Sequence, residues 1–250
     1  MDIEISAISD KGPVRARNED MLLVDKTLIR NGDYSQKLAL SQDEFHFIVA
    51  VADGMGGQNA GDVASEMVIR ELTEVVQAIP AQASQAEVCE ALASGCHEIH
   101  NVMAQKGREN PDLAAMGSTL TGLFACDSTL YYIHVGDSRL YRYRDGVLKQ
   151  ITRDHSLRQV SGNENVPQNI IMNSFGGGAE IDVEMDPVGG VVLEGDCFLL
   201  CSDGLSDMLD DDVIESIMAC DARLNELKDE AVRLGGKDNI SLILVDIQAT

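Results

Sequence analysis

The 250 residues of this chain include 42 acidic side chains against 19 lysines and arginines, which gives a formal net charge of −23 at pH 7. So acidic a chain is a poor general binder of nucleic acid or of anionic membranes. Because 44% of its residues are hydrophobic and no apolar run approaches the ~20 residues of a membrane span, we expect a packed core and no membrane association.

The six cysteines indicate the redox state of the cellular compartment in which the protein folds. They lie within apolar segments, include no Cys-x-x-Cys pair and follow no secretory leader. Reduced, buried thiols are the simplest account, and they favour a cytoplasmic protein.

Short strand patterns dominate the start of the chain. Alternating β-prone residues predict strands at 3–8 and 21–24, on either side of a polar loop over 10–20. Residues 26–44 are polar and predict a surface hairpin or loop. The apolar run 48–52 is bounded by turn residues, so it predicts a buried strand that ends at an aspartate.

Two helices are predicted next. Apolar residues recur at helical spacing between 63 and 76. The sequence Ser84-Gln85-Ala86-Glu87 is a capping box, which predicts the start of a second helix that continues to Met103. Two amphipathic helices in succession indicate a helical layer packed on a sheet.

The second half of the chain begins with closely spaced strands. Segments 119–126, 130–135 and 140–144 are separated by turns, which indicates an antiparallel meander. The region 156–178 is polar and glycine-rich, and we expect a mobile surface loop there. The later elements expected are strands near 181–185 and at 197–201, helices at 211–219 and 221–234, and a final strand at 240–247.

Strands that run separately from paired helices predict an α+β fold in which helices cover antiparallel sheets. No internal repeat or linker divides the chain, so residues 1–250 are expected to form a single domain.

Acidic residues recur in turns at the ends of predicted strands. They are Asp53, Asp137, Asp203 and Asp238, with Glu19 and Asp20 in the loop between the first two strands. Aspartate is common in turns, so any one of them is more often a turn residue than a ligand. If the strand ends meet at one rim, however, the carboxylates repel one another unless cations lie between them. Oxygen ligands alone favour Mg²⁺ or Mn²⁺ over zinc.

The glycines after Asp53 give the same stretch a second role. They permit close backbone approach, so the carbonyl of Gly54 could also face a cation. A phosphate-binding loop is excluded, because Asp62-Val63 stands where Lys-Ser/Thr is required.

Taken in order, these motifs resemble the PPM family of metal-dependent Ser/Thr protein phosphatases (type 2C), particularly its bacterial members. The matching segments are Arg15-Ala16-Arg17-Asn18-Glu19-Asp20, Asp53-Gly54-Met55-Gly56-Gly57, Gly117-Ser118-Thr119, Val135-Gly136-Asp137-Ser138-Arg139, Thr152-Arg153-Asp154-His155-Ser156, Ser202-Asp203-Gly204-Leu205 and Gly236-Lys237-Asp238-Asn239-Ile240. Each is a weak signal alone, but their shared order along almost the whole chain is specific.

The resemblance implies an αββα sandwich with a binuclear Mg²⁺ or Mn²⁺ centre at one end. The implied roles are Asp53 bridging both ions, Asp203 and Asp238 completing one site, Glu19 and the Gly54 carbonyl serving the other, Asp20 supporting that shell, Asp137 with Asp203 binding a third, weaker ion, and Arg15 gripping the phosphate. It further implies hydrolysis of phosphoserine and phosphothreonine by attack of a metal-bridging hydroxide, without a covalent enzyme intermediate.

The implied partners are phosphorylated proteins, including those of a bacterial Ser/Thr kinase that the enzyme opposes. Two alternatives stay open: a low-activity regulatory PPM domain, and a phosphohydrolase of small phosphate esters. Retention of the four core carboxylates argues against the first, whereas the second shares the same chemistry.

Three departures from the family pattern concern the surroundings of the site. Met55 stands where eukaryotic members carry a histidine proposed to protonate the leaving oxygen, and Gln58 replaces a histidine common in bacterial members. Within 156–178, the stretch between Ser156 and Asn169 is shorter than the bacterial flap, the segment beside the active site, which affects the expected substrate contacts and the third ion.

Overall fold

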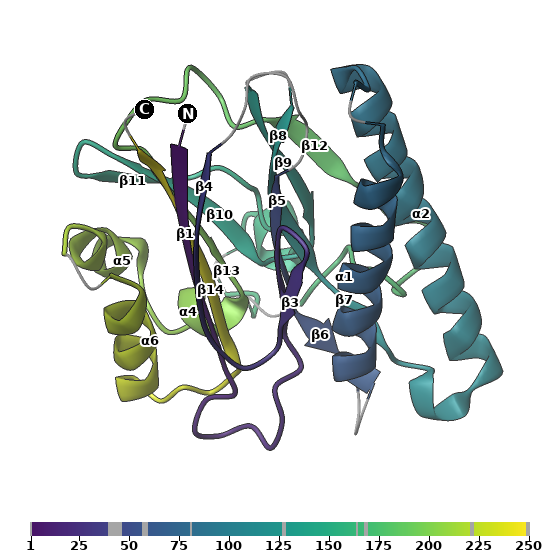
Figure 1. The fold of residues 1–250 in the computed structure, drawn as a ribbon. Coiled ribbons are helices and arrows are strands. Elements are labelled where there is room, and N and C mark those ends of the chain that lie inside the picture. The colour runs from purple at the N-terminus through teal and green to yellow at the C-terminus, as the bar shows by residue number, and fades with distance from the viewer. Residues whose placement is uncertain are drawn as a thin grey trace.

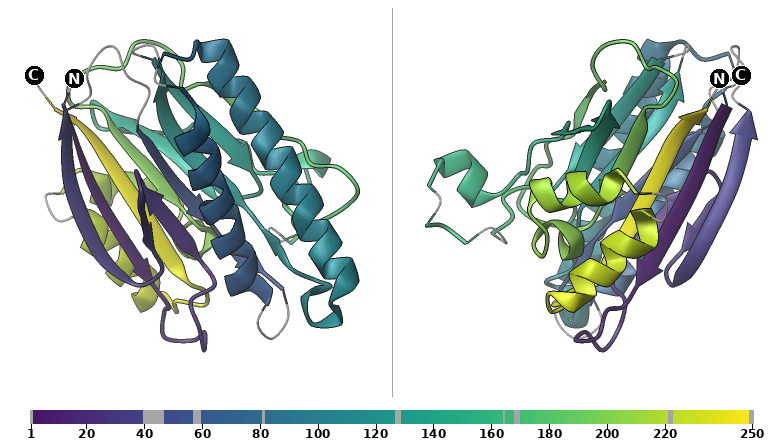
Figure 2. Two further views of the ribbon diagram at one scale, coloured as in Figure 1. Left: turned by 45° about the vertical axis from the view of Figure 1, so that its right-hand side comes forward. Right: turned by 90° about the vertical axis from the view of Figure 1, so that its left-hand side faces the viewer.

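A computed structural model describes residues 2–39, 47–56, 60–80, 82–126, 129–163, 165–167, 170–220 and 223–248. Two six-stranded antiparallel sheets face each other, and helices cover the outer face of each sheet (Figures 1 and 2). The predicted α+β, four-layer αββα sandwich is confirmed.

The first sheet has the strand order β11-β10-β13-β14-β1-β4. Its strands are β1 (Asp2–Asp10), β4 (Gly32–Ala39), β10 (Arg139–Arg144), β11 (Val147–Gln150), β13 (Cys197–Cys201) and β14 (Ile240–Gln248). On its outer side lie the helices α4 (Asp203–Ser206), α5 (Asp211–Met218) and α6 (Arg223–Arg233).

The second sheet has the order β12-β9-β8-β5-β2-β3. Its strands are β2 (Met21–Val24), β3 (Thr27–Ile29), β5 (Ile48–Ala52), β8 (Leu120–Cys126), β9 (Thr129–Val135) and β12 (Glu184–Pro187). The helices α1 (Ala60–Ala78) and α2 (Gln85–Glu109) cover it. A short ribbon of β6 (Gly54–Met55) and β7 (Gly117–Ser118), a 3-10 turn η1 (Pro111–Leu113) and the short helix α3 (Leu157–Ser161) complete the described elements.

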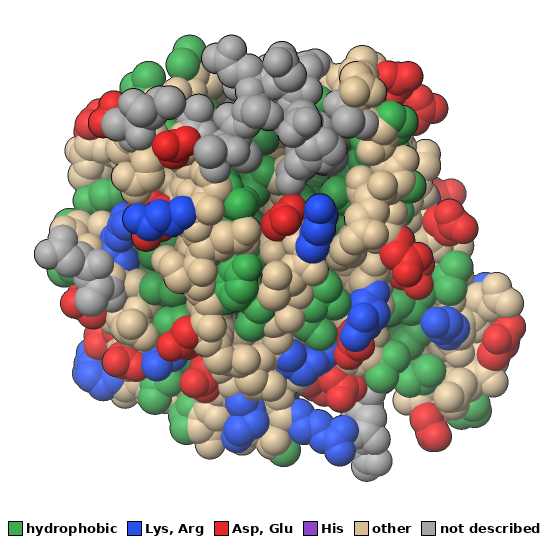
Figure 3. Space-filling view, in the orientation of Figure 1, with side chains coloured by type: hydrophobic (Ala, Val, Ile, Leu, Met, Phe, Trp, Pro, Cys, Tyr) green, Lys and Arg blue, Asp and Glu red, His purple; other side chains and the backbone are tan. Residues whose placement is uncertain are grey.

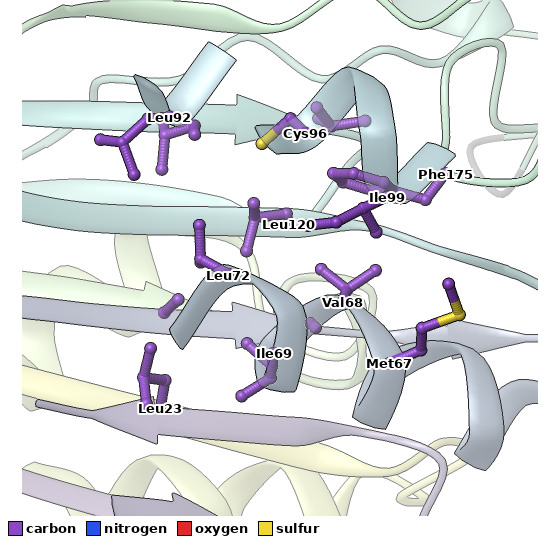
Figure 4. Close-up of a cluster of buried hydrophobic side chains, with 14 of the residues drawn as sticks. Leu23, Met67, Val68, Ile69, Leu72, Leu92, Cys96, Ile99, Leu120 and Phe175 are labelled. Carbon is purple, nitrogen blue, oxygen red and sulfur yellow. The ribbon is translucent and has the colours of Figure 1, made fainter. Parts of the chain in front are cut away.

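Alternation along the strands divides the core into three layers. Ile48 and Ala50 of β5 pack with α1 and α2, whereas the intervening Val49 and Val51 pack between the two sheets. Figure 4 shows the layer beneath the helices, where Leu72 of α1 lies close to Leu120 of β8. Because both faces of β5 are buried, its sequence is a continuous apolar run rather than an alternating one.

Helix ends follow the predicted signals. The Ser84 N–H donates to Glu87 Oε2 at 2.8 Å and its hydroxyl accepts from the Glu87 N–H, so the capping box is formed. At the other end of the chain, α6 stops before Gly235 and Gly236, both with positive φ, and the Gly236 N–H donates to Ala231 O at 3.0 Å.

The prediction of a surface hairpin or loop over 26–44 was wrong in its main feature. β3 pairs with β2, and β4 is a full strand at the edge of the first sheet, paired with β1. Tyr34 and Leu38 of β4 pack against the layer between the sheets, while alternate residues face outward, and so the polar composition hid a half-buried strand. Residues 40–44 lie outside the described ranges.

Smaller differences concern short elements. β11 and α4 were not predicted, and the strand expected near 181–185 is formed instead by β12, which begins at Glu184. The loop expected over 156–178 contains α3, and the turn expected at 127–128 lies outside the described ranges. None of the described helices combines the length and apolar character that a membrane crossing requires.

Candidate metal centre

The predicted carboxylates meet at one end of the two sheets. Asp53 directly follows β5, and Met21 at the start of β2 pairs with Ala52, which brings the end of the 10–20 loop beside Asp53. In the other sheet, the Ser202 N–H donates to Ser241 O at 3.0 Å, so the end of β13 lies beside the start of β14. The turns carrying Asp203 and Asp238 are therefore neighbours.

Asp20 and Asn239 join the two sheets at this rim. The buried Asp20 carboxylate accepts a hydrogen bond from Ser202 Oγ at 2.8 Å. Asn239 Oδ1 accepts from the Glu19 N–H at 2.7 Å, and its amide nitrogen donates to Lys11 O and Arg17 O. Asn239 was part of a recognised motif, but only the structure shows that it fastens the 10–20 loop beside Asp238.

Gly54 and Glu19 lie against the first turn of α1. A Cβ at Gly54 would stand 2.0 Å from Gly61 O and 2.6 Å from Glu19 O. A Cβ at Gly61 would stand 2.7 Å from Gly54 O and 2.9 Å from Glu19 Cδ. Both positions require glycine because backbone is packed on backbone here, and this packing sets the Gly54 carbonyl next to the Glu19 carboxylate.

Asp137 is tied to Asp53 through two hydroxyl groups. The Asp53 N–H donates to Thr119 Oγ1 at 3.0 Å, and Thr119 Oγ1 lies 2.8 Å from Ser138 Oγ. Asp137 itself is buried in the turn between β9 and β10. The structure therefore gathers all the acidic residues predicted for the site at the same rim.

The carboxylates strongly perturb one another. Desolvation, followed by the charges of neighbouring carboxylates, raises the pKa of Asp53 and of Asp203 well above the ordinary value. Desolvation likewise raises the pKa of Asp20 to about 6, although hydrogen bonds from Ser241 and Ser202 oppose the shift. The pKa of Asp137 is raised to about 7, by desolvation and then by other carboxylates.

One acidic residue that contributes to these pKa shifts was not predicted from the sequence. Asp207 follows Asp203 by four residues, its N–H donates to Asp203 O at 2.8 Å, and its charge helps to raise the pKa of both Asp137 and Asp203. The i, i+4 spacing of the two aspartates was the available signal, but it has this meaning only if the segment is helical.

Arg15 brings positive charge to the rim. Its guanidinium forms an ion pair with the Asp238 carboxylate and is about half exposed. Lys11 and Arg17 are exposed on the same loop, and Figure 3 shows Lys and Arg side chains gathered over the loop between β1 and β2, at the lower edge of that view. A phosphate group approaching an otherwise acidic chain would meet local attraction here.

The donor set fits divalent cations. Within the described ranges, no group of three or more His, Cys, Asp or Glu side chains is already arranged to hold an ion. However, the buried Oδ1 atoms of Asp137 and Asp203 have no hydrogen-bond partner. Unpartnered buried oxygens among mutually repelling carboxylates are compensated by cations, and a set made only of oxygens suits Mg²⁺ or Mn²⁺.

Two residues of the recognised motifs form a compensated pair beside this site. Arg139 donates to Asp154 from both Nε and Nη2, at 3.0 and 2.7 Å, and both side chains are largely buried. Arg139 also donates to Tyr141 Oη at 2.9 Å, and that hydroxyl donates to Asp211 Oδ1 at 3.0 Å. This network links β10 to the start of α5.

Met55 has a packing role. It pairs with Gly117 in the β6-β7 ribbon, where a Cβ on Gly117 would lie 3.2 Å from Met55 Cγ. A thioether supplies no proton, so the residue at this position does not act as a general acid. Gln58 lies outside the described ranges.

Comparisons with known proteins identify the family. Residues 28–234 match the family model described as Protein phosphatase 2C. The chain belongs to this family. The serine/threonine phosphatase stp of Listeria monocytogenes is 33% identical over 256 residues, covering 97% of this chain and 95% of the relative. The 2C-type match excludes Glu19 and Asp238, but the similarity to stp extends over nearly the whole chain.

Two solved structures share this 2C-type fold. The serine/threonine phosphatase of S. agalactiae superposes with a TM-score of 0.84 at 26% identity, covering 98% of this chain and all of that one. The catalytic domain of the protein phosphatase PstP, solved in complex with two manganese ions, gives a TM-score of 0.75 at 32% identity, with complete coverage of both chains.

Proposed function

We propose that the carboxylate rim is the metal and phosphate site of a metal-dependent protein serine/threonine phosphatase, and that residues 1–250 form one catalytic domain around it. Membership of the 2C family makes the chain a phosphoprotein phosphatase that depends on Mn²⁺ or Mg²⁺. The observation that supports these particular residues is the gathering of acidic groups with raised pKa values at one rim, two of whose buried oxygens have no partner.

The residues divide into two core sites and a weaker one. The proposed assignment is Asp53 to both core ions, Asp203 and Asp238 to one of them, Glu19 and the Gly54 carbonyl to the other, and Asp137 with Asp203 to a third ion. The close packing of Gly54, Glu19 and Gly61 supports the second core site. The Ser202–Ser241 contact, which brings Asp203 beside Asp238, supports the first.

When bound, the divalent ions supply Lewis acidity that lowers the pKa of a water molecule and neutralises phosphate charge. The chain's own residues orient the reactants. Asp20 is held by Ser202 Oγ beside Asp53, and its carboxylate can accept a hydrogen bond from water there. Arg15 can release Asp238 and hold two phosphate oxygens in bidentate fashion.

The substrates are phosphorylated proteins. We further propose that they include targets of a bacterial Ser/Thr kinase that this enzyme opposes. Cys96, Cys197 and Cys201 are buried thiols, which supports the proposal of a reducing compartment such as the cytoplasm. We propose that 156–178 contains the shortened flap and that its described part, which carries α3 and projects away from the two sheets (Figure 2, right), contributes to substrate choice.

A phosphatase assay with and without EDTA tests this function. Mn²⁺ should support phosphate release from a phosphothreonine peptide, and Asp53→Asn or Asp238→Asn should abolish it. Asp33→Asn, at an exposed position of β4, is the matched control and should retain full activity. Unchanged turnover in either site variant would refute the metal assignment, and turnover of a small aryl phosphate without any of the peptide would favour the small-ester alternative.

A further inference from the structure

His155 holds the turn that carries Asp137, although the proposed mechanism does not use this histidine. The backbone N–H of Gly136 donates to the ring nitrogen Nδ1 of His155 at 3.1 Å, and the backbone N–H of His155 donates to Gly136 O at 2.7 Å. Gly136 directly precedes Asp137 and has a φ of +109°. Two hydrogen bonds from a single residue therefore fix the backbone that aims the Asp137 carboxylate.

The other contacts of the His155 ring define its tautomer. Nδ1 also accepts from Asn173 Nδ2 at 2.8 Å, while Nε2 lies 3.2 Å from Glu184 Oε1. Two N–H donors at Nδ1 and a carboxylate at Nε2 require the proton to be on Nε2. The backbone of Asp182 holds Asn173 in turn. Asn173 Nδ2 donates to Asp182 O at 2.7 Å, and the Asp182 N–H donates to Asn173 Oδ1 at 3.1 Å.

The same residue closes the neck of a projecting segment. The Met172 N–H donates to His155 O and the Leu157 N–H donates to Ile170 O, both at 2.8 Å. The chain thus leaves the sandwich after His155 and returns to it at Met172. In the right-hand view of Figure 2, the described part of the segment between them, with α3, projects away from the two sheets.

A second histidine supports His155 from the core. His134 is fully buried, and its ring centroid lies 4.6 Å from that of His155. His134 Nδ1 lies 2.9 Å from Thr121 Oγ1, which donates to Ser138 O at 2.8 Å. Gly136 and Ser138, the two neighbours of Asp137, are therefore held by one connected set of contacts around the histidine pair.

We propose that His155 is a positioning residue that couples the projecting segment that carries α3 to the placement of the Asp137 carboxylate. This inference rests on the proposed function, because the affected property is cation binding at the weaker site assigned to Asp137 and Asp203. The His155 ring contacts both Asn173 at the neck and the Gly136 N–H. A change on either side of the ring should therefore alter the position of Asp137 Oδ1.

Two isosteric variants separate the two sides of the ring. Asparagine places an amide oxygen near the Nδ1 position and can still accept from the Gly136 N–H, whereas glutamine places an amide nitrogen near Nε2 and keeps only the Glu184 contact. Titration of the full chain with Mn²⁺ by calorimetry should show the weak-site Kd raised about 10-fold in His155→Gln but within about threefold of wild type in His155→Asn. The tight sites should be unchanged in both.

The control variants act on either side of His155. Asp137→Asn should lose the weak site, and Asn173→Ala, at the half-buried neck, should weaken it in the same direction as His155→Gln. Thermal unfolding in EDTA checks that each variant folds. Equal weak-site affinity in wild type and His155→Gln, an equal loss in His155→Asn and His155→Gln, or no change in Asn173→Ala would overturn the inference.

The wild-type titration separates this inference from the proposed function. Two tight Mn²⁺ ions without a third would overturn the positioning role and leave the phosphatase assignment intact. No bound Mn²⁺ would overturn both.

Discussion

Two groups of acidic side chains lie side by side at the rim of the sandwich, and they differ in their partners. Asp154 is bonded by Arg139 through two nitrogens and by Gln150 at 2.8 Å, so its charge is compensated within the chain. Asp53 and Asp203 instead face other carboxylates, whose charges add to desolvation in raising their pKa values.

The comparison distinguishes structural acids from acids that await a cation. A buried charge that is paired and hydrogen-bonded stabilises its surroundings only while both partners remain. A buried carboxylate surrounded by like charges costs folding free energy until a cation arrives. The two groups should therefore respond in opposite ways when a carboxylate is replaced by a neutral amide. Neutralising Asp154 should reduce stability without a primary loss of metal binding. Neutralising Asp53 or Asp203 should reduce metal binding without a loss of stability.

The largest expected effect is on catalysis. Asp203→Asn removes a charge assigned to a core ion, so kcat/KM toward a phosphothreonine peptide should fall by at least about 100-fold in saturating Mn²⁺. The metal-free variant should unfold in urea at the same or a higher concentration than wild type, since one repulsive charge is gone. Retained activity, or a marked loss of metal-free stability, would place Asp203 with the structural acids.

The second effect is on stability. Asp154→Asn removes the closest charged partner of the largely buried Arg139 and leaves the exposed Asp211, whose Oδ1 lies 3.8 Å from Nη1, so it should reduce the free energy of unfolding by about 3–5 kcal/mol. Replacing both residues by leucine in one chain removes the uncompensated charge, so the double variant should recover much of that loss. Urea unfolding in EDTA measures both. A double variant less stable than Asp154→Asn would show that the pair contributes more than compensation.

Elements with strong periodicity or capping could be predicted from the sequence. The apolar run of β5 and the capping box at Ser84 act locally, and both predictions are confirmed. β4 was assigned to a surface hairpin or loop because its buried face depends on two apolar residues, Tyr34 and Leu38, which pack in the layer between the sheets. Pairing with β1 supplies the order that local composition does not.

The site could be predicted as a set of residue types but not as a set of contacts. Aspartates at strand ends, combined with the family resemblance, predicted a set of acidic residues that the structure brings together at one rim. The spacing of residues in the sequence could not reveal that Asn239 holds the 10–20 loop or that Asp154 forms an ion pair with Arg139. Both interactions depend on contacts between segments that are distant in the sequence. Asp154 and Asp203 look alike in sequence, and only their partners separate them.

The third prediction concerns pH. Asp20 has a folded-state pKa of about 6 against an ordinary value of 3.8, so its protonation favours the folded, metal-free chain below about pH 4, and this contribution is lost as the pH rises through 6. Asparagine cannot ionise, so Asp20→Asn should match wild type near pH 4 and exceed it by about 3 kcal/mol near pH 8. Urea unfolding in EDTA at several pH values measures the difference.

Saturating Mn²⁺ is the control for that experiment. Bound cations compensate the carboxylates around Asp20, so the advantage of the asparagine variant near pH 8 should shrink or reverse. An advantage that is independent of pH would assign the effect to packing or hydrogen bonding rather than to charge.

The smallest expected effect separates the two exposed arginines beside the site. Arg15→Ala removes a bidentate phosphate contact, and should lower kcat/KM by about 10- to 100-fold, mainly through KM. Arg17 lies two residues away, is similarly exposed and stands 3.8 Å from Asp62, so Arg17→Ala changes the net charge equally without removing the proposed contact.

If general attraction at the loop dominates, both variants should lose activity alike and high salt should abolish the difference from wild type. If Arg15 binds the phosphate, its loss should exceed that of Arg17→Ala at every salt concentration, because a direct charge-assisted contact is screened far less than a diffuse field.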